Sequence, residues 1–308
     1  MPERFGMSFK KRFGRMLAAE QLAFLRRRRR LWGEHLERAR AFIGDALQNA
    51  DSSRPILILG AGHGLEIPWG LAPKSAIGWD ADPTARVGTL LRHGRFPPWV
   101  FDDFTGSMEG LYSVALRVQK REGTWATRPA EVAARRLAGL LPSVPTSPAP
   151  LEEWLENNHP GTIICANVLG QVRPTAHRLV ELAFKPRDPW LDDPDLEDPL
   201  QEALDVWTAR AIRAVLAILG QRGAKGAGLY LLHDRGVIHN ETDLSLGAWA
   251  DPWTAQLKTG ATGLEVEDPL PGVDVLEELK HLRPTSQARW LWPLGPGQTH
   301  VVEALAFK

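Results

Sequence analysis

The segment Ile56-Leu57-Ile58-Leu59-Gly60-Ala61-Gly62-His63-Gly64 joins four apolar residues to three glycines at alternate positions. A short apolar run bounded by a turn predicts a buried strand of an α/β sheet. Glycines at alternate positions allow a tight strand-to-helix turn, and they leave no side chains between the backbone and a bulky ligand. The segment therefore predicts a nucleotide-type cofactor site at the end of a buried strand.

The spacing of these glycines restricts the kind of ligand. The dinucleotide pattern Gly-x-Gly-x-x-Gly requires a third glycine at position 65, where this chain has Leu65. A phosphate loop requires Lys-Ser or Lys-Thr after the glycines, and neither follows them. A glycine-rich turn is also consistent with a purely structural role, so the ligand depends on further motifs.

A second strand is predicted at Ser75–Asp80, and it ends in a carboxylate. Asp80 lies twenty residues after Gly60, where a carboxylate can accept hydrogen bonds from both hydroxyls of a ribose. Both NAD and S-adenosylmethionine contain a ribose that could be bound there. From these residues alone, both cofactors remain open.

The two segments 59–64 and 78–83 together resemble the first two cofactor motifs of class I S-adenosylmethionine-dependent methyltransferases. In that family the second motif often reads Gly-x-Asp-x-x-Pro, which Gly78, Asp80 and Pro83 match. The resemblance favours S-adenosylmethionine over NAD. It implies a cofactor but no methyl acceptor.

Two later segments follow in the order that the resemblance implies. Trp99–Asp103 is similar to a third strand ending in acid, where family members hold the adenine amino group. Thr162–Val172 is similar to the fourth strand and its loop, beneath the methionine portion of the cofactor. Asp102 and Asn167 could each instead cap a helix, because Asp and Asn are favoured there. The cofactor contacts implied by the resemblance are Gly60, Ala61, Gly62, Gly64, Asp80, Ala81, Asp103 and Asn167.

The end of the chain predicts how the sheet closes. A fifth strand is expected at Gly228–Asp234, and a terminal hairpin at Ala288–Pro293 and His300–Phe307. Methyltransferases of this class end their sheet with an antiparallel strand, whereas a dinucleotide-binding half adds parallel ones. We therefore expect an α/β fold, with a Rossmann-like, mostly parallel seven-stranded sheet, helices on both faces and an antiparallel C-terminal hairpin.

The domain organisation is predicted as a basic helical extension at 1–50 and a class I methyltransferase-like domain at 51–308. Insertions are expected at about 104–160 and 185–200, the second rich in acidic residues and proline. The run Arg26–Arg30 could contact nucleic acid. However, apolar residues at helical spacing from Leu25 to Leu47 favour an amphipathic helix with solvated arginines.

Composition limits the class of protein. The chain has 308 residues, 44% of them hydrophobic, and its 37 basic and 37 acidic residues give no net charge. No apolar run approaches the roughly 20 residues of a membrane span, and no signal peptide is evident, so we expect a cytoplasmic protein without membrane contact. The single cysteine, Cys165, excludes an intrachain disulfide and a cysteine-cluster metal site, and we expect no bound metal.

The expected activity is S-adenosylmethionine-dependent methyl transfer to an unidentified acceptor, with a small molecule favoured over protein or RNA. Cys165 does not follow a proline, as the nucleophile of RNA cytosine-C5 methyltransferases usually does. The segment 167–170 lacks the prolines and aromatic residue of amino-directed nucleic-acid methyltransferases. Two alternatives stay open: a non-catalytic methyltransferase-like binding or regulatory protein that uses the basic helix or the acidic loop, and an NAD-dependent oxidoreductase.

A proton acceptor is needed only if the methyl acceptor must lose a proton. Methyl transfer otherwise relies on positioning, so no obvious catalytic residue is required. His233, Asp234 and His239 near the end of the fifth predicted strand are candidate bases, and His63 in the glycine turn is a weaker one.

Overall fold

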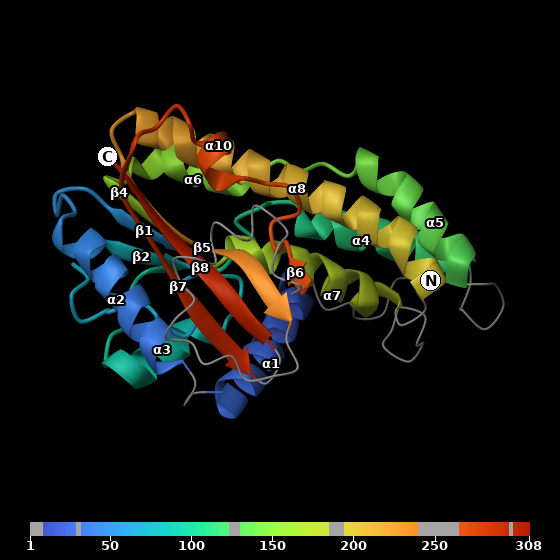
Figure 1. Cartoon of the computed structure of the whole chain (residues 1–308), viewed down its shortest axis with the longest axis horizontal. Coiled ribbons are helices and arrows are strands. Elements are labelled where there is room, and N and C mark those ends of the chain that lie inside the picture. The colour runs from blue at the N-terminus through green and yellow to red at the C-terminus, as the bar shows by residue number, and fades with distance from the viewer. Residues whose placement is uncertain (1–8, 29–31, 123–129, 185–193, 240–264, 296–297) are drawn as a thin grey trace, which may run out of the picture.

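The fold is an α/β structure built on one central sheet (Figure 1). The computed structural model describes residues 9–28, 32–122, 130–184, 194–239, 265–295 and 298–308. Within these ranges the main strand order is β3-β2-β1-β4-β5-β8-β7, and β6 pairs with β5 as an addition. The strands are β1 (Ile56–Leu59), β2 (Ala76–Trp79), β3 (Trp99–Val100), β4 (Thr162–Ala166), β5 (Gly228–His239), β6 (Glu265–Glu267), β7 (Pro284–Gly295) and β8 (Gln298–Phe307).

Strand direction confirms the predicted fold class. Strands β1 to β5 pair in parallel, whereas β8 is antiparallel to both of its neighbours, β5 and β7. A dinucleotide-binding sheet has the order 3-2-1-4-5-6 with parallel strands. Here the last strand lies between β5 and β7, which gives the mostly parallel seven-stranded sheet with a C-terminal hairpin that the sequence predicts.

Helices cover both faces of this sheet (Figure 1). Those of the larger layer, α4, α5, α7 and α8, pack against one another, and their far end extends beyond the sheet. On the opposite face α2 contacts β4, β5 and β7. The helices are α1 (Phe9–Arg28), α2 (Gly33–Gln48), α3 (Ala85–His93), α4 (Met108–Glu122), α5 (Ala130–Leu140), α6 (Ala149–Asn158), α7 (Val172–Phe184), α8 (Pro194–Ala224) and α10 (Val275–Glu278).

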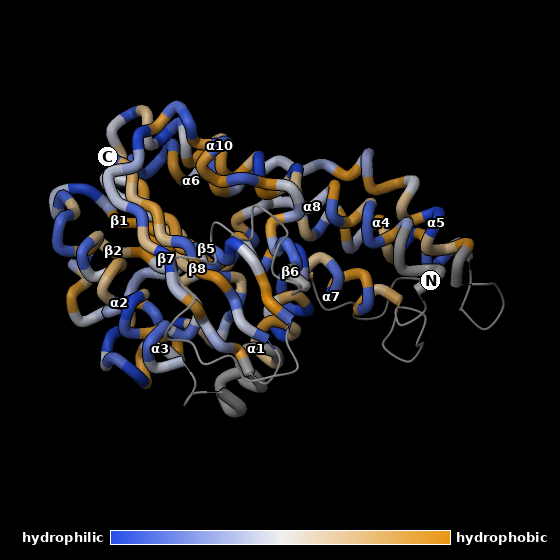
Figure 2. The backbone as a smooth tube through the Cα atoms, in the orientation of Figure 1, coloured by the Kyte–Doolittle hydropathy of each residue, from blue (hydrophilic) through white to orange (hydrophobic). Residues whose placement is uncertain are grey.

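Strand β1 is buried on both faces, which explains its uninterrupted apolar sequence. Leu57 and Leu59 join the core beneath α4, α7 and α8, whereas Ile56 and Ile58 join the core beneath α2. Side chains of a strand alternate between faces, so both sets must be apolar. In Figure 2 hydrophobic and hydrophilic segments alternate along helices such as α7 and α8, as expected for helices with one face on the core.

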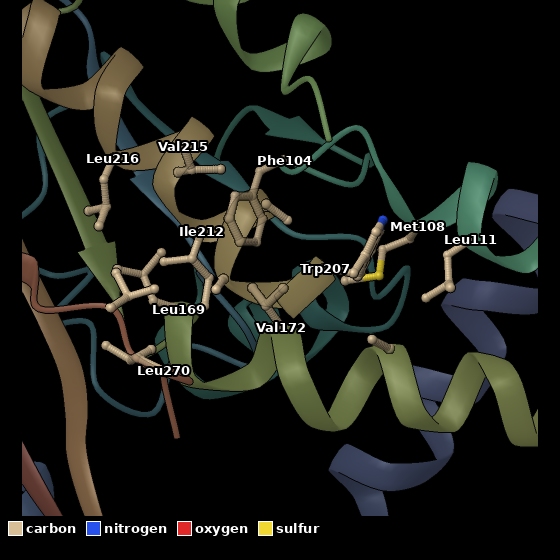
Figure 3. Packing of buried hydrophobic residues seen from close by; sticks show 14 of the residues in the cluster. Phe104, Met108, Leu111, Leu169, Val172, Trp207, Ile212, Val215, Leu216 and Leu270 are labelled. Atoms are coloured by element: carbon tan, nitrogen blue, oxygen red, sulfur yellow. The ribbon is translucent and has the colours of Figure 1, made fainter. Parts of the chain in front are cut away.

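The larger core lies between the sheet and the long helix α8. Trp207, Ile212 and Leu216 of α8 are fully buried there. Figure 3 shows Trp207 together with Met108 and Val172, which belong to α4 and α7. These three helices therefore pack into one apolar core against the parallel strands.

The connection from β1 to β2 contains no helix, although the glycine turn predicts one directly after the strand. Residues 60–75 instead form turns, with Ile67 and Trp69 buried against the sheet. Pro68 and Pro73 explain the difference, because proline lacks the N–H that a helix interior needs and clashes with the preceding turn. The prediction of a strand-to-helix turn is therefore wrong at this point.

The N-terminal residues form two helices. Ala39 and Ile43 of α2 are fully buried, as the amphipathic pattern predicts, and Phe13 of α1 joins the larger core. The side chains of Arg26–Arg30 lie outside the described part of the structure, as do residues 185–193 of the predicted acidic insertion. The predicted insertion at 104–160 contains α4, α5 and α6. In the ranges given above, none of the helices has the length and apolar character needed to cross a membrane.

Replacing Trp207 by alanine should destabilise the fold by about 3–5 kcal/mol, because it removes a fully buried indole from the core. Urea unfolding followed by circular dichroism measures the change. The control is its neighbour Val206, which is 57% exposed, so Val206→Ala should change stability by no more than about 0.5 kcal/mol. Equal losses for the two variants would contradict this account of the core.

Candidate functional site

A cavity of about 300 Å³ lies where strands β1, β2 and β4 end, at the edge of the sheet where open α/β sheets bind ligands. Its wall also contains Phe13 and Leu17 of α1, Met108 at the start of α4, and Trp292 of β7. All of the cofactor contacts implied by the sequence resemblance line this cavity, namely Gly60, Ala61, Gly62, Gly64, Asp80, Ala81, Asp103 and Asn167.

The three glycines adopt left-handed backbone conformations, with φ of +68° at Gly60, +47° at Gly62 and +67° at Gly64. A Cβ atom at Gly60 would lie 2.4 Å from Cβ of Val168, so this glycine permits the close approach of the loop after β4. A Cβ atom at Gly62 would have no neighbour closer than 3.8 Å. Gly62 therefore exposes bare backbone beside open space, as a ligand-binding turn requires.

The Asp80 carboxylate joins the turns that follow β1 and β2. The Gly62 N–H donates to its Oδ2 at 2.8 Å, and the Asp82 N–H donates to its Oδ1 at 2.8 Å. Burial raises the pKa of Asp80 to about 6, although these two backbone bonds oppose the rise. Because a carboxylate has about four acceptor positions, Asp80 can accept further hydrogen bonds from a ligand.

His63, the weaker candidate base, is held between the same two turns. Its Nε2 lies 3.0 Å from Asp82 Oδ2 and 3.2 Å from Thr84 Oγ1. The Thr84 N–H and hydroxyl both donate to the other oxygen of Asp82, each at 2.7 Å. His63 and Asp82 are buried, and this cluster locks the glycine turn to the loop after β2.

Asp103 uses its acceptor positions inside its own loop. It accepts hydrogen bonds from the Thr105 N–H and hydroxyl, and from the N–H groups of Ser107 and Met108. Burial raises the pKa of Asp103, and these bonds oppose the rise. Asp103, and not Asp102, therefore accepts the backbone N–H groups at the start of α4. A bond from Asp103 to an adenine amino group remains a prediction.

Asn167 follows β4 in a left-handed conformation, with φ of +50°, which asparagine tolerates better than most residues. Its Nδ2 donates to Glu66 Oε1 at 3.1 Å. Its Oδ1 is buried and has no hydrogen-bond partner in the structure. An unsatisfied buried acceptor in a cavity wall is costly, and it indicates a position where a ligand could donate.

The candidate bases on β5 do not line the cavity. His233 Nε2 lies 3.3 Å from Glu303, Asp234 lies 3.1 Å from His300, and exposed His239 pairs with Glu267 at 2.9 Å. A catalytic role for His233, Asp234 or His239 remains a prediction that this geometry does not favour.

Glu66 was not identified from the sequence, and its carboxylate is bonded both to the residue after β4 and to helix α2. Glu66 lies just after the glycine turn, lines the cavity, and accepts at Oε1 from Asn167 and from Nε2 of His35. The Trp290 indole N–H donates to His35 Nδ1 at 3.0 Å, so the His35 proton resides on Nε2. No local pattern marks Glu66, because His35 and Trp290 come from opposite ends of the chain.

The cavity lining is acidic. Among the described residues that form it, no lysine or arginine appears. In the same part of the chain, no group of three or more histidine, cysteine, aspartate or glutamate residues is arranged to hold a metal ion. The carboxylates of the lining are Glu66, Asp80, Asp82, Asp102 and Asp103.

No protein-family model and no curated protein matches the sequence. Among solved structures, the chain is similar to a SAM-dependent methyltransferase from Anabaena variabilis ATCC 29413, with 12% identity and a TM-score of 0.34. The match covers 87% of this chain and 84% of that one. A similarity at this level does not indicate what this chain binds, which has to be argued from the cavity.

Replacing Gly60 by alanine should cost about 1–3 kcal/mol more stability than replacing Gly62, because only the Gly60 methyl group would collide with Val168 and the Ala166 carbonyl oxygen. Both variants also bear the cost of a left-handed alanine, about 1–2 kcal/mol. Urea unfolding of the two variants measures the difference. Equal losses would show that the turn and the β4 loop are not packed as described.

Proposed function

We propose that this chain is an S-adenosylmethionine-dependent methyltransferase whose cofactor binds in the acidic cavity. The observation that carries the proposal is the combination of a glycine turn, a carboxylate after β2 and a cavity lining with five carboxylates and no described cationic side chain. S-adenosylmethionine carries a positive sulfonium, a positive amino group and one carboxylate, so its net charge is positive. An acidic lining attracts such a ligand and disfavours one dominated by phosphate charge.

The residues present fit this cofactor. Asp80 offers acceptor positions to the ribose hydroxyls, and Gly62 leaves room beside the backbone. The unsatisfied Asn167 Oδ1 suits a donor such as the cofactor amino group. The acceptor atoms of Asp80 and Asn167 and the open backbone at Gly62 together support the ligand that the sequence motifs imply.

The cofactor, when bound, supplies an electrophilic methyl group that a nucleophile can displace from sulfur. The protein's contribution is mainly position and exclusion of water. Asp80 and the glycine turn hold one side of the site, while Phe104, Met108 and Val172 join its wall to the apolar core. A side chain that accepts a proton is needed only if the methyl acceptor loses a proton in the reaction.

An NAD-dependent reaction has less support. Dinucleotide sites place the pyrophosphate at the N-terminus of a helix after the glycine turn, where free N–H groups and the helix dipole favour negative charge. In this chain, residues 60–75 form no helix. The surrounding carboxylates would also repel a diphosphate.

A small methyl acceptor fits this cavity better than a large one. Phe13 and Leu17 of α1 form part of its wall, and a Cβ atom at Gly14 would lie 2.7 Å from Pro83. Lys10 pairs with Asp102 at 2.7 Å and adds to the same cover. Helix α1 therefore lies against the loop after β2 and narrows the access that a protein or RNA substrate would need.

Calorimetric titration with S-adenosylhomocysteine, with NAD as the parallel ligand, tests the cofactor. We expect micromolar binding of the first alone, and Asp80→Ala should weaken it by about 1.5–3 kcal/mol through loss of charge-assisted hydrogen bonds. The exposed Asp45 on α2 provides a control, since Asp45→Ala should leave the affinity unchanged. Preferential binding of NAD, or no binding of either ligand, would contradict the proposal.

The pH dependence of the same titration tests Asp80 directly. Its raised pKa of about 6 means that roughly one tenth of the free protein has Asp80 ionised at pH 5. Because ribose hydroxyls donate to the ionised form, binding should be about tenfold weaker at pH 5 than at pH 7.5. Asp80→Asn should remove this dependence. An unaltered chain that binds equally well at both pH values would exclude Asp80 from the site.

A further inference from the structure

One corner of the cavity is built from aromatic rings and a carboxylate. Trp32 and Trp292 line it, with ring centroids 5.3 Å apart and planes at 81°. Glu66 lines the cavity beside them. We call Trp32, Glu66 and Trp292 the aromatic corner. Its members come from the residue before α2, the loop after β1 and strand β7, so only the folded chain brings them together.

The Glu66 carboxylate is fixed in this corner by a buried chain of hydrogen bonds. His35 is fully buried and stacks on Trp292, with ring centroids 4.0 Å apart and planes at 7°. Because His35 Nδ1 accepts the Trp290 N–H, His35 carries its proton on Nε2. This Nε2–H donates to Glu66 Oε1, with a nitrogen-to-oxygen distance of 3.1 Å. Asn167 donates to the same oxygen. In the described part of the chain no donor is bonded to Oε2, so Glu66 keeps one oxygen for a ligand.

The charge of the corner comes from Glu66, because the indoles of Trp32 and Trp292 are neutral and contribute ring surface and N–H groups. Aromatic rings attract cations through their electron-rich faces, and they do so more strongly where water is excluded. A fixed carboxylate beside two tryptophans that line the cavity is suited to a positively charged nitrogen that carries N–H or N–CH₃ groups.

We propose that the aromatic corner binds a positively charged nitrogen of the methyl acceptor, so that the substrate is an organic amine. This inference rests on the proposed function and adds the substrate class. Helix α2 and strand β7 supply none of the glycine-turn and strand-end residues that fit the cofactor. The two tryptophans therefore lie outside the set of residues that fit the cofactor, and Glu66 connects them to that set through the bond that it accepts from Asn167.

Three probes of matched shape test the charge preference: benzylamine, benzyl alcohol and benzoate. Each is titrated into the full-length protein at pH 7.5, with and without saturating S-adenosylhomocysteine, and binding is followed by ligand-observed NMR. We expect benzylamine to bind at least tenfold more tightly than benzyl alcohol, and benzoate to bind least. This comparison uses the unaltered chain and needs no variant to fold. Equal binding, or no binding, of the three probes overturns the proposal.

The Glu66→Gln variant tests whether the Glu66 carboxylate is responsible for the preference for a positively charged probe. It keeps the size of the side chain and should lower benzylamine affinity about tenfold, while S-adenosylhomocysteine affinity changes less than twofold. Exposed Glu34 at the start of α2 gives the control, since Glu34→Gln should alter neither affinity. Thermal unfolding checks that both variants are folded.

The two proposals can fail separately. If Glu66→Gln weakens S-adenosylhomocysteine as much as benzylamine, Glu66 belongs to the cofactor subsite and the assignment to the acceptor is wrong. If the benzylamine affinity is unchanged in Glu66→Gln, the Glu66 carboxylate does not bind the positive nitrogen and the inference is overturned. Absence of S-adenosylhomocysteine binding refutes the methyltransferase proposal, and with it the identification of the amine as a methyl acceptor.

Discussion

The architecture of the cavity depends on one carboxylate. Asp80 accepts backbone N–H groups from Gly62 and Asp82, and so fixes the turn after β1 relative to the loop after β2. Its burial is unfavourable for the charged form, as the raised pKa shows. A half-buried carboxylate with further acceptor positions lies beside the cavity, and a ligand with adjacent hydroxyls would complete this arrangement.

A second network closes the cavity from the ends of the chain. The bond from Trp290 to His35 joins residues 255 positions apart, and His35 in turn orients Glu66 beside the glycine turn. All of these groups are buried or nearly so, where a misplaced hydrogen bond is costly. The network therefore couples the packing of α2 and β7 to the position of a carboxylate in the cavity, and it gives the proposed substrate site a rigid wall.

Local sequence patterns predicted the sheet well because they depend on few residues. The apolar run of β1, the glycines, the carboxylate after β2 and the terminal hairpin each occupy a short segment whose meaning follows from alternation and turn chemistry. The same reasoning failed directly after the glycines, where Pro68 and Pro73 prevent a helix. It considered a helix cap as an alternative role for Asp102, whereas Asp103 accepts the N–H groups at the start of α4.

The amino-acid pattern alone was enough to predict the sheet, its antiparallel closure and the residues that gather at the ends of β1, β2 and β4. It could do so because parallel strands present their carboxyl ends at one edge, so polar residues that follow different strands must become neighbours. The packing of distant segments, in contrast, brings Glu66 and Trp292 together in the cavity wall with His35 behind them, and leaves His233, Asp234 and His239 outside the lining. Contacts between distant segments depend on how helices pack across the sheet, and no local pattern contains that information.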